Sequence, residues 1–312
     1  MRMKNQGIKL LVLVLFNLIV NNVLAQQEAQ YTHYMYNPSI INPAFTGYRN
    51  TLSATLLHRS QWIGLSGAPT SQTFSISSPL TNEKVALGLN LSNDIVGPLT
   101  DMAINGDFAY TILTENSNLS FGLKAGIKRM TFDPSKLTFE DQTDSDFNII
   151  KNQILPQIGI GFMYEKENLY LGMSVLNLIE TDFKNAQKNP LYNANERRNY
   201  YGSVGYIFNL KDNLDLKTSM LIKAVAGAPL QTDLSANFLI NKKVTLGAAY
   251  RWDAAISCLF GYQVSESFLI GAAYDYETST LKNNTSGSGE IVLRYDFLNS
   301  LSSKRILNPR IF

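Results

Sequence analysis

The chain has 312 residues, of which 45% are hydrophobic, 11% aromatic and 17% charged. Its 27 basic and 25 acidic residues nearly balance, and no long basic cluster or basic–aromatic array occurs, which argues against nucleic acid as a partner. A single cysteine, Cys258, excludes an internal disulfide. A chain this aromatic and this weakly charged suits either a soluble β-sandwich or a membrane protein, and the strand pattern has to decide between them.

Residues 1–25 are predicted to form a secretory signal peptide. Three basic residues within the first nine precede an apolar run from Leu10 to Val20, and Val23-Leu24-Ala25 places small residues at a cleavage position. The alternative, a retained transmembrane anchor, needs roughly 20 apolar residues, and this run is shorter. No second apolar run of comparable length follows, so we expect no membrane helix.

Residues 26–49 are predicted to form an arm ahead of the first strand. Asn37-Pro38 and Asn42-Pro43 favour an extended backbone, because proline fixes its own φ and disfavours the α conformation of the preceding residue. The arm is too short for a core of its own. It also carries large apolar groups whose burial is worth roughly 1.5 to 3 kcal/mol each, so it must dock on another surface. These groups are Tyr34, Tyr36, Ile40, Ile41 and Phe45.

A β-hairpin with an aromatic, glycine-rich loop follows the arm. Polar and apolar residues alternate from Asn50 to Ser60 and again from Thr70 to Ser78. Between these two runs, Trp62, two glycines and Pro69 break the alternation.

The same alternation recurs nearly to the end of the chain. The alternating segments centre near residues 55, 74, 89, 107, 125, 160, 173, 204, 220, 236, 248, 259, 272 and 293. In segments such as 119–127, 244–252 and 291–297, one face is apolar and the other is small or charged. A small soluble barrel would carry its bulky apolar side chains inward, together with a polar outer face. Large apolar residues opposite a small or charged face instead fit strands between lipid and a wet lumen. We therefore expect a small inward residue such as Gly122 to tolerate serine.

These strands predict an all-β fold: a single transmembrane antiparallel β-barrel of about 14 strands in the outer membrane, because only a closed barrel pairs every backbone group in lipid. The barrel is expected over residues 50–297, with a periplasmic tail at 298–312. The arm would then dock either into the barrel mouth as a partial plug or onto a periplasmic partner.

Short polar links alternate with longer links along this pattern. Since barrels place short turns in the periplasm, we expect loops near Thr143 and Lys188 outside, turns near Glu83 and Lys166 in the periplasm, and both chain ends on the periplasmic side. Aromatic residues near the strand ends are expected to form interfacial girdles. They are Trp62, Tyr110, Tyr164, Tyr170, Tyr200, Tyr250, Trp252, Tyr274 and Tyr276.

The sequence offers little catalytic chemistry. His58 lies two residues from Ser60, so both would share one face of a strand, as a serine hydrolase might require. Leu52 and Leu56 lie on that face as well, which favours an interfacial histidine beside lipid. We therefore expect no enzyme, no catalytic residue and no cofactor.

Charged residues suggest two further sites, each with a simpler explanation. Asp141, Asp144, Asp146 and Asn148 could bind calcium, but the glycine of a calcium loop is missing and a solvated acidic loop is favoured, so no metal site is predicted. Twelve charged residues are expected in the lumen, either as a salt-bridge network or as a partner-binding surface. They are Arg59, Lys124, Lys128, Lys217, Lys223, Arg251, Asp253, Asp275, Glu277, Glu290, Arg294 and Asp296.

The stretches Tyr34-Met35-Tyr36-Asn37-Pro38, Ile41-Asn42-Pro43-Ala44-Phe45-Thr46-Gly47 and Arg59-Ser60-Gln61-Trp62-Ile63-Gly64 through Gly67-Ala68-Pro69 resemble the opening of mature PorP/SprF proteins. Weaker similarity occurs at 135–142 and 308–312. These proteins are outer-membrane components of the type IX secretion and gliding machinery. The resemblance implies a non-enzymatic role, either linking the outer membrane to a periplasmic ring of the machine or anchoring a secreted adhesin.

Of these two roles we favour the adhesin anchor. The expected partners are a secreted adhesin or its C-terminal secretion domain, periplasmic ring proteins of the secretion system, and outer-membrane lipid. The alternative is a small-molecule channel, because about 14 strands lies between small filled barrels and porins of roughly 16 to 18 strands. The residues expected to bind a partner are Tyr34, Tyr36, Phe45, Arg59, Trp62, Arg251 and Arg294.

Overall fold

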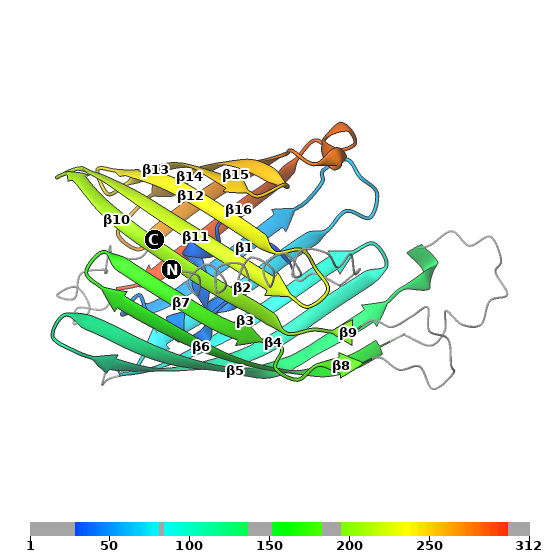
Figure 1. The fold of residues 1–312 in the computed structure, drawn as a ribbon, viewed down its shortest axis with the longest axis horizontal. Coiled ribbons are helices and arrows are strands. Elements are labelled where there is room, and N and C mark those ends of the chain that lie inside the picture. The colour runs from blue at the N-terminus through cyan, green and yellow to red at the C-terminus, as the bar shows by residue number, and fades with distance from the viewer. Residues whose placement is uncertain (1–28, 81–83, 137–151, 183–194, 299–312) are drawn as a thin grey trace, which may run out of the picture.

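A computed structural model describes residues 29–80, 84–136, 152–182 and 195–298. Within these residues, 14 antiparallel strands form a closed barrel in which each strand pairs with its neighbours in chain order and β1 pairs with β16 (Figure 1). The prediction of a 14-stranded barrel is confirmed, and every predicted segment centre lies within a strand. The described residues contain no helix that is long and apolar enough to cross a membrane.

The barrel strands are β1 (Leu52–Ser60), β2 (Thr70–Pro79), β3 (Val85–Val96), β4 (Leu99–Leu113), β5 (Ser117–Phe132), β6 (Asn152–Lys166), β7 (Leu169–Leu176), β10 (Asn199–Lys211), β11 (Leu214–Val225), β12 (Gln231–Ile240), β13 (Val244–Arg251), β14 (Ala255–Gln263), β15 (Phe268–Glu277) and β16 (Ser288–Phe297). A separate two-stranded sheet, which the sequence pattern did not predict, pairs β8 (Thr181–Asp182) with β9 (Asn195–Glu196).

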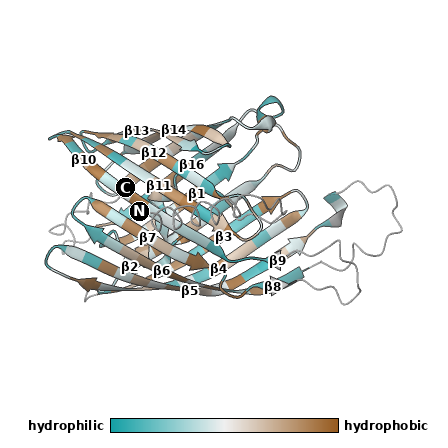
Figure 2. Cartoon of the chain, viewed as in Figure 1, coloured by the Kyte–Doolittle hydropathy of each residue, from teal (hydrophilic) through white to brown (hydrophobic). Residues whose placement is uncertain are grey.

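Apolar side chains cover the outside of the barrel, as the alternation predicts. Along β5, Leu123 and Ile127 are 55% and 51% exposed, whereas Ser120 and Lys124, which point inward, are buried. Apolar and polar residues alternate along the strands of the wall in Figure 2. The apolar outer face suits lipid, and the lumen takes the polar and charged groups.

The two ends of the barrel differ. At one end the connections are tight, such as 167–168 between β6 and β7 and 241–243 between β12 and β13. At the other end they include the loops 61–69 and 278–287. We refer to these as the short-turn end and the long-loop end.

The barrel wall is higher on one side of the long-loop end. There β4, β5 and β6 have 15 or 16 residues each, whereas β13 has 8. On the upper part of β5 and β6, Arg129 Nη2 donates a hydrogen bond to Asn152 Oδ1 at 2.8 Å, and Thr131 Oγ1 donates to the same oxygen at 3.1 Å. Apolar side chains are exposed at the same level, because the cross-strand partners of Arg129 are Met102 and Ile154, which are 55% and 70% exposed.

The loop 61–69 packs against other loops at this end. Ile63 N–H donates to Gly287 O, and Ser286 N–H donates back to Ile63 O, both at 2.8 Å. Gly97 N–H donates to Gly67 O at 2.9 Å, which joins this loop to the turn between β3 and β4. The predicted hairpin of β1 and β2 is confirmed by their antiparallel pairing.

Some local predictions are wrong. The arm is not extended but forms three short 3₁₀ turns, η1 (Tyr34–Tyr36), η2 (Pro38–Ile40) and η3 (Pro43–Phe45). Proline opens η2 and η3, because its fixed φ suits a first helical position where its missing N–H is not needed. Tyr170, expected in a girdle, points into the lumen and is 4% exposed. Other predicted girdle residues are exposed on the outside: Tyr110, Tyr200, Tyr250, Trp252, Tyr274 and Tyr276.

Several predictions fall outside the described residues. They concern the signal peptide, the acidic loop and its possible calcium binding, and the tail after residue 298. The side of the membrane on which Thr143, Lys188 and Glu83 lie is a further prediction of this kind. The membrane sides of the two termini likewise stay predictions.

The outward register of β5 predicts that Leu123→Arg is destabilising. A charge near the bilayer midplane costs about 2 to 4 kcal/mol in a barrel of this kind, whereas Leu123→Met, which conserves volume, costs less than about 1.5 kcal/mol. Equilibrium unfolding of the two variants in lipid or detergent measures the difference. Equal stabilities would contradict the register.

The arrangement of the connections predicts the orientation in the membrane. We would introduce a single cysteine at Lys282, at the long-loop end, or at Glu266, at the short-turn end, in a Cys258→Ser background. Both positions are exposed. On intact cells, only the cysteine at 282 is expected to react with an impermeant maleimide, because short turns face the periplasm. Permeabilised cells, in which both should react, are the control, and labelling at 266 on intact cells would reverse the orientation.

Candidate functional site

The arm lies inside the barrel, where its blue ribbon crosses the lumen in Figure 1. Residues 31–47 are buried apart from Ile40. At the long-loop end, Gln30 Nε2 donates to the side-chain oxygen of Gln231 at 2.6 Å, and at the short-turn end Thr51 Oγ1 donates to Phe297 O at 2.7 Å. The arm therefore runs the length of the lumen and plugs it, which is the first of the two docking modes considered from the sequence.

Glycines in the wall make room for the backbone of the arm. A Cβ atom added to Gly122 on β5 would overlap Ala44 N and Pro43 C, and one added to Gly161 on β6 would overlap Asn42 Oδ1. Any larger residue at these positions would push η3 away from the wall. The expectation that Gly122 tolerates serine is therefore wrong, because the inward side of β5 faces packed chain and not water.

Asn42 fixes the arm to the same part of the wall. Its Nδ2 donates to Phe162 O on β6 at 3.0 Å and to Met173 O on β7 at 3.2 Å. Its Oδ1 accepts from Ala44 N–H at 2.9 Å and so caps η3. One side chain thus satisfies two strand carbonyls and orders the turn that enters the glycine-lined part of the wall.

The aromatic residues of the arm pack against the barrel itself. Tyr34 Oη forms a 2.7 Å hydrogen bond with Ser219 Oγ on β11. Phe45 meets Tyr170 of β7 edge to face, with ring centroids 5.9 Å apart. The guanidinium carbon of Arg294 lies 5.5 Å from the ring centroid of Tyr36. These arm residues, expected to bind a partner, are thus buried against the lumen.

A buried ionic cluster holds the start of the arm to β1, β15 and β16. Arg59, 1% exposed, donates from Nη2 to Asp275 Oδ2 at 2.7 Å and from Nη1 to Glu290 Oε2 at 3.3 Å. Glu290 also accepts from the backbone N–H of Thr32 at 2.9 Å and of His33 at 2.6 Å, and lies 2.9 Å from His33 Nδ1. The arm thereby supplies part of the hydrogen bonding that the buried carboxylates need.

Two further arginines extend this network. Arg251 Nε donates to Asp233 Oδ1 at 2.9 Å. Arg294 Nε lies 3.6 Å from Asp296 Oδ2, and Arg49 of the arm binds the same carboxylate at 2.8 Å. These ion pairs favour the salt-bridge explanation of the charged lumen. All twelve predicted lumen residues face inward except Asp253, which is exposed in the turn after β13.

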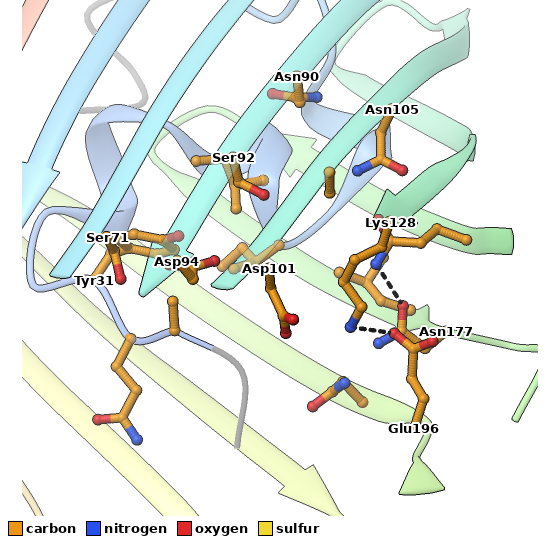
Figure 3. A pocket seen from close by; sticks show the side chains of 18 of the residues that line it. Tyr31, Ser71, Asn90, Ser92, Asp94, Asp101, Asn105, Lys128, Asn177 and Glu196 are labelled. Atoms are coloured by element: carbon orange, nitrogen blue, oxygen red, sulfur yellow. Dashed lines mark hydrogen bonds and ion pairs between the residues drawn. The ribbon is translucent and has the colours of Figure 1, made fainter. Parts of the chain in front are cut away.

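A cavity of about 410 Å³ remains between the arm and the wall near the long-loop end. Figure 3 shows Asp94 and Asp101 together on one wall and Lys128 with Glu196 on another. Trp62 also lines this cavity, alone among the residues predicted to bind a partner.

Outside the lumen, the described residues offer little for catalysis or metal binding. His58 Nε2 lies 3.2 Å from Ser60 Oγ on the outer face, next to Leu56, which is 51% exposed. This is the lipid-side placement that the sequence predicts. Within the described ranges, no group of three or more His, Cys, Asp or Glu residues is arranged to hold a metal ion.

Sequence reasoning missed the residues that receive the arm. The contacts of Asn42 with β6 and β7 were not predicted, and among the inward glycines only Gly122 was named, as a position facing a wet lumen. A signal was present for the glycines, because Gly122, Gly161 and Gly172 fall at inward positions of neighbouring strands, and a glycine inside a strand often marks a close backbone approach.

Comparisons with known proteins identify relatives of this chain. A family model described as type IX secretion system membrane protein PorP/SprF matches residues 23–295. The toluene transporter TbuX of Ralstonia pickettii has a TM-score of 0.51 at 10% identity, covering 90% of this chain and 99% of that chain. Omp33 of Acinetobacter baumannii has a TM-score of 0.47 at 8% identity, covering 80% and 100%. At such identity the likeness to TbuX shows the barrel fold alone. No curated protein matches.

The close contact between arm and wall predicts that Gly161→Ala is destabilising. The added methyl group would overlap Asn42 Oδ1, and overpacking of this kind typically costs about 1 to 3 kcal/mol. The matched control is Gly202→Ala, where a Cβ meets nothing within 4 Å, with an expected change within about 0.5 kcal/mol. Denaturant unfolding compares them, and equal stabilities would mean that the arm does not lie against β6.

The ionic cluster predicts a larger effect for Arg59→Met. This change leaves Glu290 without its arginine and Asp275 with only the more distant Arg251 Nη1 at 3.8 Å, and breaking a buried ion pair from one side costs about 3 to 5 kcal/mol. Adding Glu290→Gln and Asp275→Asn in the same chain should recover part of the loss, because the uncompensated charges are gone. Unfolding measurements on the single and triple variants test this, and an unaffected single variant would contradict it.

Proposed function

Because this chain belongs to the PorP/SprF family of type IX secretion system membrane proteins, we propose that it is a non-enzymatic outer-membrane anchor that holds a secreted adhesin at the cell surface. The observation that carries this proposal is the arm, which fills the lumen with buried side chains. A barrel closed in this way offers a surface to bind and no passage to cross.

The arm argues against the alternative, a small-molecule channel. It contacts opposite sides of the wall, through Asn37 Nδ2 to Ser75 Oγ on β2 at 2.8 Å and through Tyr34 to Ser219 on β11. Porins leave an aqueous lumen. Here a solute could pass only if the arm left the barrel, which would expose Glu290 and Arg59 without their partners in the arm.

The long-loop end supports a client on the cell surface. Long loops of outer-membrane barrels face outside, and the cavity lined by Trp62 lies at this end together with the high wall of β4, β5 and β6. The short-turn end offers tight turns such as 241–243. Among the described residues, those turns give a small contact surface for a periplasmic ring, which favours the anchoring role over the linking role.

The expected partner-binding residues divide accordingly. We assign Trp62 to direct contact with the client, because it lies at the rim of the cavity. The buried residues among them hold the arm in place, so their substitution would act on the client through the arm. They are Tyr34, Tyr36, Phe45, Arg59, Arg251 and Arg294.

The experiment compares cells with and without this protein by proteolytic shaving of the cell surface and mass spectrometry. We expect one secreted protein to leave the surface and appear in the medium while other type IX cargo stays in place. Complementation with the full chain should restore it. An unchanged surface profile would refute the anchoring role, and accumulation of all type IX cargo in the periplasm would favour the ring link instead.

A plugged lumen predicts the conductance of the purified protein. In planar bilayers the full chain should be silent, whereas a variant lacking residues 31–45 should insert, remain heat-modifiable and conduct, because deletion empties most of the lumen. The Gly202→Ala variant, altered only on the outer face, is the silent control. A steady pore from the full chain would support the channel.

A further inference from the structure

The high wall at the long-loop end finishes in a strand edge that no neighbouring barrel strand covers. β6 pairs with β5 over its full length from Asn152 to Lys166, but its pairing with β7 begins only at Ile160, because β7 ends at Leu176. In the described part of the chain, β8 and β9 form a sheet of their own and do not continue the barrel. Residues 152–159 of β6 thus have a barrel partner on one side, and we call the other side the free edge of β6.

Backbone groups along the free edge point away from β5. Ile158 O accepts a hydrogen bond from Leu178 N–H at 2.9 Å on this side. Alternate residues of an antiparallel strand direct their N–H and C=O groups to the same side, so Asn152, Ile154 and Pro156 also direct theirs to the free edge. Within the described ranges, these three residues receive no backbone hydrogen bond there. A row of such groups is a template for pairing with another chain.

Pro156 influences which chain can pair with the free edge. Proline has no N–H and is confined within sheets to edges and similar positions, so residue 156 offers an acceptor alone, whereas Ile154 offers a donor and an acceptor. Proline on an edge also disfavours the pairing of that edge with its own copy, because both strands would lack a donor. The free edge therefore suits a guest strand, meaning a strand supplied by a different protein.

The cavity of about 410 Å³ lies on the inner side of the free edge. Leu155 and Gln157 point inward from this part of β6 and line the cavity, and Leu176 of β7 and Asn199 of β10 line it from beyond the edge. Cross-strand neighbours share one face of a sheet. A guest strand on β6 would therefore direct every second side chain into the cavity and the others to the outside.

Charge and exposure indicate which guest side chains fit. The charged residues that line the cavity balance, three basic against three acidic, so a charged guest side chain would upset this balance. They are Lys124, Lys128, Arg197, Asp94, Asp101 and Glu196. On the outer face, Ile154 and Ile179 are 70% and 43% exposed. Neutral polar side chains therefore suit the inward positions of the guest, and aliphatic ones suit the outward positions.

We infer that the free edge of β6 binds an extended segment of a secreted protein by strand addition, with neutral polar side chains in the cavity and aliphatic side chains beside Ile154. In this mode of recognition, main-chain hydrogen bonds give affinity and pockets for alternate side chains give specificity. The free edge lies at the long-loop end, and long loops of barrels face outside. The inference rests on the proposed function, since the segment would belong to the anchored client.

Peptide binding to the full chain in detergent tests the inference. The probe is fluorescein-labelled Thr-Val-Asn-Val-Thr-Val-Asn-amide, which alternates aliphatic and neutral polar residues and favours a strand. The control is fluorescein-labelled Thr-Val-Asn-Pro-Pro-Val-Asn-amide, whose adjacent prolines remove one main-chain donor from each edge of the peptide. We expect a saturable rise in fluorescence anisotropy with the probe and a Kd at least about tenfold higher for the control, as expected for losing main-chain hydrogen bonds.

A proline in the protein then locates the site. Ile154→Pro removes an N–H from the free edge and spares the pairing with β5, because residue 154 directs its backbone groups to the same side as Pro156. The Kd of the probe should rise about tenfold. The matched control, Ile154→Val, keeps the N–H and should leave the Kd nearly unchanged. Heat-modifiability verifies folding, and the comparison of the two peptides on the unaltered chain needs no variant at all.

Three results would overturn the inference. They are equal affinity for the two peptides, an unchanged Kd in the Ile154→Pro variant, and a dimer of the protein in detergent that Ile154→Pro dissociates, which would make the free edge an interface between two copies. Failure of the anchoring role is separate, because it shows in the surface profile of cells lacking the protein and not in peptide binding.

Discussion

Hydrocarbon offers a backbone no hydrogen-bond partner, and the rest of this structure depends on that constraint. It forces the 14 strands into a closed ring. The interior of a barrel of this size has to be filled either by water or by protein side chains. Here the interior carries Arg59, Arg251 and Arg294 with their carboxylates, and the arm occupies the space that water takes in a porin. The barrel is therefore a folded protein with a core of its own, in which the outer face is apolar and the core is partly ionic.

The arm is bound by the wall on one side of the lumen and borders a cavity on the other. On the side of β1, β15 and β16, Glu290 and Arg59 bind backbone and side-chain groups of the arm, so the arm is held there by hydrogen bonds and ion pairs. On the side of β3 to β6, glycines bring η3 against the wall, and the space above it stays open as the cavity. The arm thus forms one wall of the cavity, because Ile40 and Ile41, which line it, belong to the arm. A ligand in this cavity would touch both the wall and the plug, and its affinity would depend on the position of the arm.

The sequence predicted the strands well and the interior poorly. Period-two alternation specifies which face meets lipid, so the register of Leu123 and the number of strands could be read directly. It does not say what fills the lumen. Tyr170 has the same parity on β7 as the inward Gly172, so the alternation alone points it into the lumen, but its packing partner Phe45 is far away in the sequence. The same holds for Gly122, whose contact with Ala44 depends on the path of the arm. Asp94 and Asp101 face each other only once the strand register is known.

The course of the arm also constrains how the protein is made. The arm directly precedes β1, one of the two strands whose pairing completes the ring, yet it lies within that ring and is bound at both of its ends. Once β1 and β16 have paired, no gap in the wall remains through which a chain with several bulky rings could enter sideways. The arm therefore either lies inside as the last pair of strands joins or enters afterwards through the short-turn end, where it is continuous with β1. Ordering of the arm and closure of the barrel are therefore coupled, because groups that β1 and β16 bury find their hydrogen-bond partners in the arm.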